Sequence, residues 1–196
     1  LFTARPNSGR PSGFDLDGNG RLGEARDAWG YGRFTGAGGM AILSRLPIGP
    51  NVTDMTATPW AQIAGATLPL APDGTPFFSD AILAELPLST TAHWIVPIDA
   101  PNGAFDLMVW SATPPVFDGP EDANGLRNRD ELTVWLPHLD RGPFVLAGNA
   151  NLDPVDGDGF PDAMADFLAD PRLTDPRPTS MGGARAADPD HAGEPG

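Results

Sequence analysis

The residues best suited to chemistry lie in an acidic, glycine-rich stretch near the start of the chain. Asp15, Asp17 and Asn19 alternate with other residues and are followed by Gly20. This is the first half of a calcium-binding loop, in which carboxylate and amide oxygens supply the ligands. The twelfth position, where such a loop needs a bidentate Glu, is Arg26. The alternative is an Asp/Gly turn held by hydrogen bonds from side chains to the backbone.

Further carboxylates and three histidines complete the set of candidate ligands. Glu24 and Asp27 lie beside the calcium-like motif but out of register with its positions. A second acidic turn after residue 152 has the same two interpretations, and its carboxylates belong to Asp153, Asp156, Asp158 and Asp162. His93 begins a strand-like run and is expected to make structural hydrogen bonds, whereas His138 and His191 are expected to face solvent.

The composition limits the classes of function. The 196 residues fit one domain, carry a net charge of −14 and include no Cys. Without Cys there is no disulfide framework, thiolate metal site or Cys nucleophile. So acidic a chain argues against a broad nucleic-acid surface, which needs clustered basic residues. No run approaches the ~20 apolar residues that span a bilayer, and we favour a secreted or periplasmic location.

The elements that must position these residues alternate between strands and helices. Residues 1–39 predict a long Gly- and Asp-rich loop, and residues 175–196 a loop or disordered tail. Between them, short apolar runs predict strands, and apolar residues at three- and four-residue spacing predict helices. The expected strands are residues 40–46, 93–98, 105–110 and 143–148, and the expected helices lie within 75–86, 127–139 and 162–168. This alternation is typical of an α/β architecture, and we expect one domain over residues 1–196.

Individual residues predict where these elements begin and end. Pro47 ends the first strand, and Ser79 or Asp80 is a suitable N-cap for the first helix. Residues 100–103 predict a hairpin turn, and Pro137 should kink or end the second helix. The core is expected to include Trp94, Trp110 and Trp135.

Three segments of the chain occur in a characteristic order. Residues 11–45 begin Pro-Ser-Gly-Phe-Asp-Leu-Asp-Gly-Asn-Gly and end Gly-Met-Ala-Ile-Leu-Ser-Arg. Residues 113–122 read Thr-Pro-Pro-Val-Phe-Asp-Gly-Pro-Glu-Asp, and residues 146–154 read Leu-Ala-Gly-Asn-Ala-Asn-Leu-Asp-Pro. With this order and spacing, the chain resembles bacterial proteins of the endonuclease/exonuclease/phosphatase superfamily from about Asn7 to His191. The resemblance implies a four-layer α/β sandwich and metal-assisted in-line attack of water on phosphate esters.

The family's functional residues can be compared with this chain position by position. The family's Gly-Asp-x-Asn turn corresponds to residues 148–151, so Asn151 matches its Asn. Asn149 stands where the family has its catalytic Asp, and a neutral amide cannot act as a general base. Ser111 occupies the position of a catalytic His and cannot carry positive charge towards a phosphoryl group. Arg45 could face phosphate in an active relative, although a salt bridge is the alternative in so acidic a chain.

The resemblance also implies that the chain is the central portion of such a domain. The family's metal-binding Glu would lie before Leu1 and its closing Asp-His pair beyond Gly196, so we expect the sandwich to be incomplete at both ends. Two functions remain open. One is a degenerate, non-catalytic domain that binds another protein chain as a structural or interaction subunit, with structural Ca²⁺ at Asp15, Asp17 and Asn19 or no cofactor. The other is an active or weakly active phosphodiester or phosphomonoester hydrolase that uses Mg²⁺ or Mn²⁺.

Overall fold

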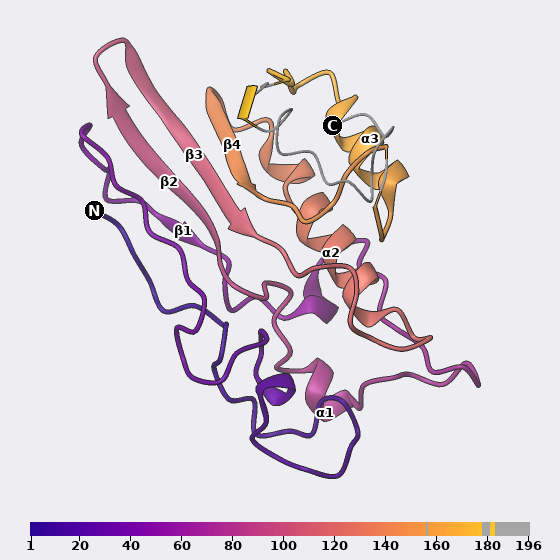
Figure 1. Ribbon diagram of the computed structural model, residues 1–196. Helices are drawn as coiled ribbons and strands as arrows, with labels where there is room; N and C mark the ends of the chain where they lie inside the picture. The colour runs from indigo at the N-terminus through magenta and orange to yellow at the C-terminus, as the bar shows by residue number, and fades with distance from the viewer. Residues whose placement is uncertain (156, 178–180, 183–196) are drawn as a thin grey trace.

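A mixed four-stranded sheet forms the centre of the molecule. The structure is a computed structural model that describes residues 1–155, 157–177 and 181–182. Its strands follow one another across the sheet in chain order and are β1 (Thr53–Asp54), β2 (His93–Ala100), β3 (Gly103–Ser111) and β4 (Phe144–Asn149) (Figure 1). β2 is antiparallel to both β1 and β3, whereas β4 runs parallel to β3. A parallel pair needs a crossover connection, and the segment between β3 and β4 contains α2 (Ala123–Thr133).

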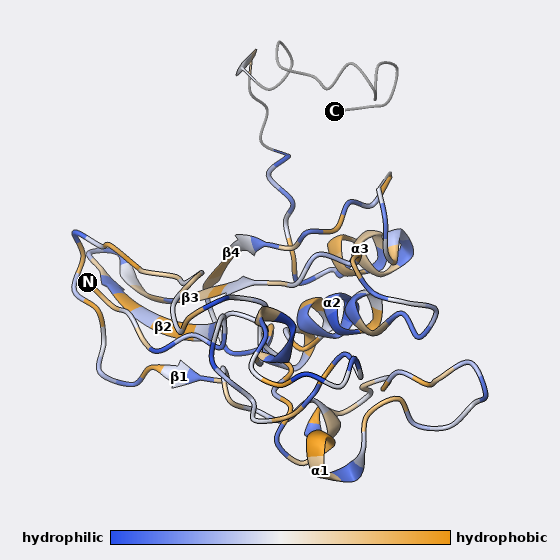
Figure 2. Ribbon diagram, turned by 60° about the horizontal axis from the view of Figure 1, so that its bottom comes forward, coloured by the Kyte–Doolittle hydropathy of each residue, from blue (hydrophilic) through white to orange (hydrophobic). Residues whose placement is uncertain are grey.

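Helices cover one face of the sheet. α2 and α3 (Pro161–Leu168) lie together beside β3 and β4 (Figure 2). Their apolar residues and those that follow α2 pack on the sheet in one cluster, whose buried members are Ile95, Met108, Trp110, Ala112, Leu132, Trp135, Met164 and Phe167. Trp135 is completely buried and meets the ring of Trp110 edge to face, with centroids 5.8 Å apart. Trp110 and Ala112 extend this cluster to the carboxyl end of β3.

The irregular first third of the chain covers part of the opposite face. Phe2 meets the buried ring of Trp94 edge to face at 5.0 Å, and Ile42 belongs to the same cluster. This N-terminal segment packs on β2 and covers β3 only in part, and it does not reach β4. Val145 and Ala147 point to this face, because Phe144 and Leu146 pack on the helix side, and both are exposed.

Short helices complete the fold. These are η1 (Ala25–Asp27), η2 (Trp60–Gln62), α1 (Asp80–Leu83) and η3 (Leu136–His138). Leu136 of η3 packs on the cluster beneath the helices, whereas residues of η2 and α1 belong to a third apolar cluster. The buried members of the cluster are Trp29, Trp60, Leu86 and Leu88. No helix in the part of the chain that the structure describes is long and apolar enough to cross a membrane.

The strand predicted over residues 40–46 does not form. Ile42 makes a single antiparallel bridge with Phe2, and Leu43 is 82% exposed. Met40 and Ile42 pack on the sheet, and among the described residues Ile42 is the one member of this run that forms a β-bridge. Residues 5–39 are irregular apart from isolated bridges and η1, as predicted.

The other predicted elements are present with shifted ends. The hairpin is confirmed, with Ala100 paired to Gly103, and all three tryptophans expected in the core are buried. α1 has Ser79 as its N-cap but is only four residues long. α2 begins before its predicted start, ends at Thr133, and leaves Pro137 in η3. The α/β class is confirmed, since a mixed sheet with helices on one face is consistent with an α/β sandwich.

His93 is a structural residue, as its position at the start of a strand predicts. The imidazole is buried and stacks on Trp135, with ring centroids 5.3 Å apart. Its Nε2 lies 2.9 Å from the backbone oxygen of Glu131, and its Nδ1 lies 2.9 Å from the hydroxyl of Ser89. A carbonyl can only accept, so Nε2 carries the proton and Nδ1 accepts from Ser89. Burial, with repulsion from Arg127, lowers the pKa of His93 to about 4.

The buried imidazole should make stability depend on pH. The folded-state pKa of His93 lies below the ordinary value of 6.5, so the unfolded chain binds more protons between these values. The free energy of unfolding of the wild type, measured relative to a His93→Gln variant, should therefore fall by up to about 3 kcal/mol as the pH drops from about 6.5 to about 4. Denaturant titrations of both proteins at several pH values measure this difference.

Glu131 makes stability change with pH in the opposite direction, but both proteins contain it. Its contribution therefore cancels in the difference between their free energies of unfolding. Burial raises the pKa of that carboxyl to about 7. Its contribution to stability is present at low pH and is lost as the pH rises from about 4.5 to about 7. A wild-type-to-variant difference that does not change with pH would show that His93 is not buried in its neutral form.

Candidate functional site at the carboxyl ends of β3 and β4

Ser111 and Asn149 lie next to each other at the end of the parallel strand pair. Their Cα atoms are register partners, and the N–H of Ala112 donates to the carbonyl of Asn149 at 2.9 Å. Residues that are 38 positions apart in the sequence therefore share one end of the sheet. Ligands of α/β proteins commonly bind at the carboxyl ends of parallel strands. The two positions singled out from the sequence are thus brought together where a ligand site is expected.

Asn149 and Asn151 are bound to each other rather than left free. The side-chain amide of Asn149 donates to the Oδ1 of Asn151 at 3.1 Å, and its own Oδ1 accepts from the Asn151 backbone N–H at 3.2 Å. Asn151 has a φ of 48°, in the left-handed region that Asn tolerates better than most residues. Its side chain donates to the carbonyl of Ala112 at 2.8 Å. The turn is therefore a closed network of amides that ties the end of β4 to the end of β3.

Gly148 is required by the packing of Trp110. A Cβ at position 148 would lie 2.4 Å from the carbonyl oxygen of Trp110 and 2.5 Å from its indole ring. Backbone and ring at this point are both fixed, because Trp110 is buried between the sheet and α2. The glycine thus lets β4 approach β3 closely just before the turn.

An open pocket of about 440 Å³ lies beside this turn. One wall is formed by residues 114–116 after β3, and the other by residues 149–153 after β4, with Gly157 and Asp158 at the rim. The lining includes two amides and the carboxylates of Asp153 and Asp158, and none of the described residues that line it is Arg or His. An anion such as phosphate would therefore meet negative charge in this pocket unless a cation accompanied it.

The polar side chains of α2 hold the two walls in place. Asn128 is completely buried, and its amide donates to the carbonyls of Thr113 and Ala150, both at 2.7 Å. Glu131 is also completely buried and accepts from the Thr113 N–H at 2.7 Å. Its other oxygen accepts from the N–H and the hydroxyl of Thr90 at 2.7 and 2.8 Å. The sequence alone does not identify these positioning residues, because a polar residue on a helix gives no signal that it faces inward.

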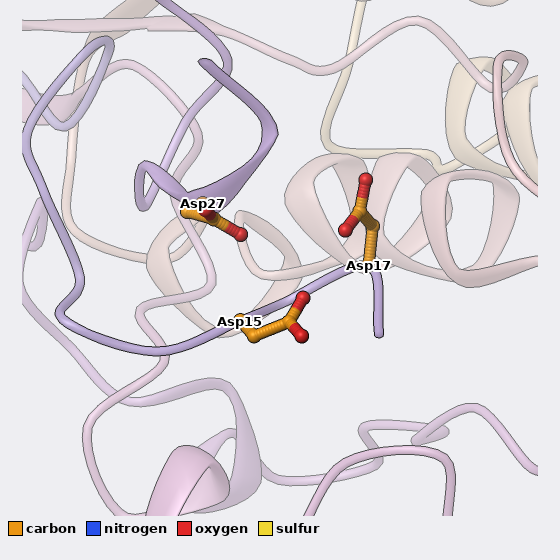
Figure 3. A group of neighbouring side chains, drawn as sticks. All are labelled: Asp15, Asp17 and Asp27. Carbon is orange, nitrogen blue, oxygen red and sulfur yellow. The ribbon is translucent and has the colours of Figure 1, made fainter. Parts of the chain in front are cut away.

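A separate acidic group lies in the N-terminal loop. Carboxylate oxygens of Asp15, Asp17 and Asp27 lie within 4.8 Å of one another and point toward a shared space (Figure 3). Asp27 is buried and also accepts from the N–H groups of Leu16 and Glu24, both at 3.0 Å. The three carboxylates could hold a metal ion.

The spacing of a calcium loop does not predict Asp27 as a ligand, because Asp27 follows the required twelfth position by one residue. The amide nitrogen of Asn19, a predicted ligand, donates to Asp17 and Glu24 at 3.1 and 2.8 Å. Its Oδ1, the atom that would bind a cation, accepts from the Arg21 N–H at 2.8 Å. The backbone N–H groups of residues 19 and 20 donate to Asp15, as expected of an Asp/Gly turn. The observed hydrogen bonds are those of an Asp/Gly turn, and the calcium site stays a prediction.

The remaining candidates are scattered. Arg45 is exposed, and it forms no salt bridge with the described residues and does not line the pocket. Asp162 lies in the first turn of α3, while Asp156 and His191 fall outside the residues that the structure describes. His138 lies on η3, half-buried beside the ring of Trp135 rather than fully solvated.

Comparison with known protein families identifies the family of the chain. The model of the endonuclease/exonuclease/phosphatase family matches residues 5–192. The chain belongs to this family. Comparisons with curated proteins and with solved structures give no match. The family has an α/β, phosphoesterase-type fold and typically depends on divalent metal ions.

Removing the Asn128 amide should destabilise this family member at the pocket. Asn128→Ala leaves the carbonyls of Thr113 and Ala150 without their buried donor, so we expect a loss of about 2–4 kcal/mol in the free energy of unfolding. Chemical denaturation measures it. Asn51→Ala is the matched control, because Asn51 is exposed and makes no side-chain hydrogen bond, and it should change stability by less than about 0.5 kcal/mol. Equal effects of the two substitutions would contradict the positioning role.

Proposed function

We propose that this chain is a degenerate phosphoesterase-fold domain that performs no hydrolysis and acts as a structural or interaction subunit. The observation that carries the proposal is the amide pair at the end of β4. Asn149, at the position of the family's catalytic Asp, uses its N–H to donate to Asn151. An amide has no basic site at neutral pH, so it cannot take a proton from an attacking water.

The surroundings of Asn149 do not replace the missing groups. Ser111, its register partner, has a neutral hydroxyl that cannot supply positive charge towards a phosphoryl oxygen. Among the residues that the structure describes, those lining the pocket provide carboxylates and amides but no Arg or His. Two of the histidines lie elsewhere, His93 in the core and His138 on η3. The fold thus keeps the frame of a hydrolytic site without the side chains that perform proton transfer and charge stabilisation.

A second candidate function is metal-dependent phosphoester hydrolysis with weak activity. It is favoured by family membership, by the matching Asn151, and by the open pocket at the expected end of the sheet. In this alternative Mg²⁺ or Mn²⁺ would bind near the carboxylates of Asp153 and Asp158. The two functions differ in whether phosphoester turnover depends on the residues of this pocket.

Hydrolysis of bis(para-nitrophenyl) phosphate separates the two candidates. With Mg²⁺, Mn²⁺ or Ca²⁺, the wild type should release no more nitrophenol than its Asn151→Ala variant, because both lack a general base. Absorbance over several hours, with and without EDTA, measures the release. Turnover that EDTA abolishes and that Asn151→Ala lowers by tenfold or more would establish the hydrolase instead.

We further propose that the N-terminal carboxylates hold a structural Ca²⁺. The sequence Asp-x-Asp-x-Asn-Gly supplies the first half of a calcium loop, and Asp27 adds a third carboxylate from one residue beyond the usual last position. Calcium accepts irregular oxygen geometry more readily than Mg²⁺ does. An ion here would offset two of the three negative charges of these close carboxylates and fasten the loop to η1.

Calcium should therefore raise the melting temperature. At millimolar Ca²⁺ we expect an increase of roughly 3–10 °C, from binding to the folded state alone. Asp17→Asn should abolish the increase, whereas Asp99→Asn, which removes an exposed carboxylate from β2, should preserve it. Differential scanning fluorimetry with Ca²⁺, Mg²⁺ and EDTA measures the shift, and equal shifts for wild type and Asp17→Asn would rule out this site.

A further inference from the structure

The N-terminal segment differs in charge from the rest of the chain. Residues 1–53 contain six of the 12 Arg residues and only four of the 26 acidic residues. The remainder contains the other six Arg residues and 22 acidic residues. Because charges on the surface act over about 10 Å at ordinary salt, an anionic partner that meets this segment responds to its local charge rather than to the net charge of the chain.

The acidic groups of this segment are engaged within their own loop, whereas several of its Arg residues are not. All four carboxylates accept hydrogen bonds from groups within residues 16–24, and they belong to Asp15, Asp17, Glu24 and Asp27. Arg26 and Arg33 are exposed and form no salt bridge with the residues that the structure describes. These two guanidinium groups therefore remain available to an external anion.

Two exposed aromatic rings accompany the unpaired Arg residues. Tyr31 is 70% exposed and Phe34 is 67% exposed, on either side of Arg33 in the sequence. The N–H of the residue after Tyr31 donates to the carbonyl of the residue before Arg26 at 3.2 Å, so the two stretches lie side by side. We call Arg26, Tyr31, Arg33 and Phe34 the aromatic-basic patch.

The backbone beneath the patch is fixed. The Ser8 hydroxyl donates to the carbonyl of Tyr31 at 3.1 Å. Gly9 has a φ of 67°, and a Cβ at this position would collide with the carbonyl of Phe34. Trp29 is buried in the apolar cluster to which α1 contributes. The indigo segment that carries the patch thus lies beside α1 and well away from β4 and α3 (Figure 1).

We propose that the aromatic-basic patch binds the surface of a bilayer that contains anionic lipids. Aromatic rings are favoured at the headgroup level of a membrane, where one part of the ring is buried and another meets water. Arg binds the phosphate groups of lipids and is attracted by the negative potential of an anionic leaflet. A nucleic acid instead needs a row of basic residues along its phosphates, and the patch has two. This inference goes beyond the proposed function and does not depend on it.

Sedimentation with lipid vesicles tests the proposal. The vesicles contain phosphatidylcholine with about 30% phosphatidylserine, and EDTA is present so that the result does not depend on calcium at the N-terminal carboxylates. We expect the wild type to bind these vesicles saturably, and to bind pure phosphatidylcholine at least about tenfold more weakly. Arg33→Glu should weaken binding to the anionic vesicles by about tenfold or more, and Phe34→Ala by about threefold or more.

Matched variants outside the patch separate its effect from that of net charge. Arg177→Glu makes the same change in charge at a side chain that is 89% exposed, and Phe117→Ala removes a ring that is 77% exposed. Both variants should bind the anionic vesicles within about twofold of the wild type. Equal losses of binding for Arg33→Glu and Arg177→Glu overturn the proposal, because net charge alone then determines the affinity.

Two measurements on the wild type alone keep the test independent of the variants. Absence of binding to the anionic vesicles up to about 1 mM lipid overturns the proposal. So does binding to single-stranded DNA that is tighter than binding to the vesicles, because the patch then serves a nucleic acid. Neither the hydrolysis assay nor the calcium-dependent melting temperature enters these measurements, so a failure here leaves the proposed function unchanged.

Discussion

The buried polar face of α2 is the interaction on which the rest of the structure depends. Much of the chain is irregular, so many loop carbonyls and N–H groups have no partner in a sheet or helix, and burying them unpaired would be costly. Arg127 donates to the carbonyls of Trp29, Pro87 and Leu88. Asp130 accepts from the Trp60 indole and the Thr67 N–H, while Asn128 and Glu131 bind the segments that follow β3 and β4. One turn of helix thus joins segments from most of the chain.

The parts of the fold that could be predicted are those determined by local pattern. The β2–β3 hairpin follows from two apolar runs with a turn between them, and every pairing in it is close in sequence. Residues 40–46 show the same apolar character but lack a neighbouring strand, and pattern alone cannot tell a strand from a segment that packs one side chain. The buried face of α2 was missed for a related reason. Its polar residues follow no hydrophobic period, and only the tertiary structure places them inside.

The candidate site could be predicted only as far as family resemblance reached. The resemblance singled out Ser111 and Asn149 separately, and the parallel pairing of β3 with β4 makes them neighbours. The walls of the pocket depend on Asn128 and Glu131, which form hydrogen bonds with loop residues far from them in the sequence. In the N-terminal loop, the twelve-residue spacing of a calcium-binding loop excludes Asp27 as a ligand by one position. The backbone bends enough to bring its carboxylate to Asp15 and Asp17.

The residues that hold the pocket are not the residues that would perform chemistry. This separation explains how catalysis could be lost without loss of the fold. Glu131 accepts three hydrogen bonds deep in the protein, and removing one partner would leave a buried charge or donor unpaired. Such a network tolerates little change. Asn149 is exposed, and the acceptor role of its Oδ1 could be filled equally by a carboxylate. Replacement of an Asp by Asn at this position therefore costs the fold little, whereas the α2 network must be retained for the strands to meet at all.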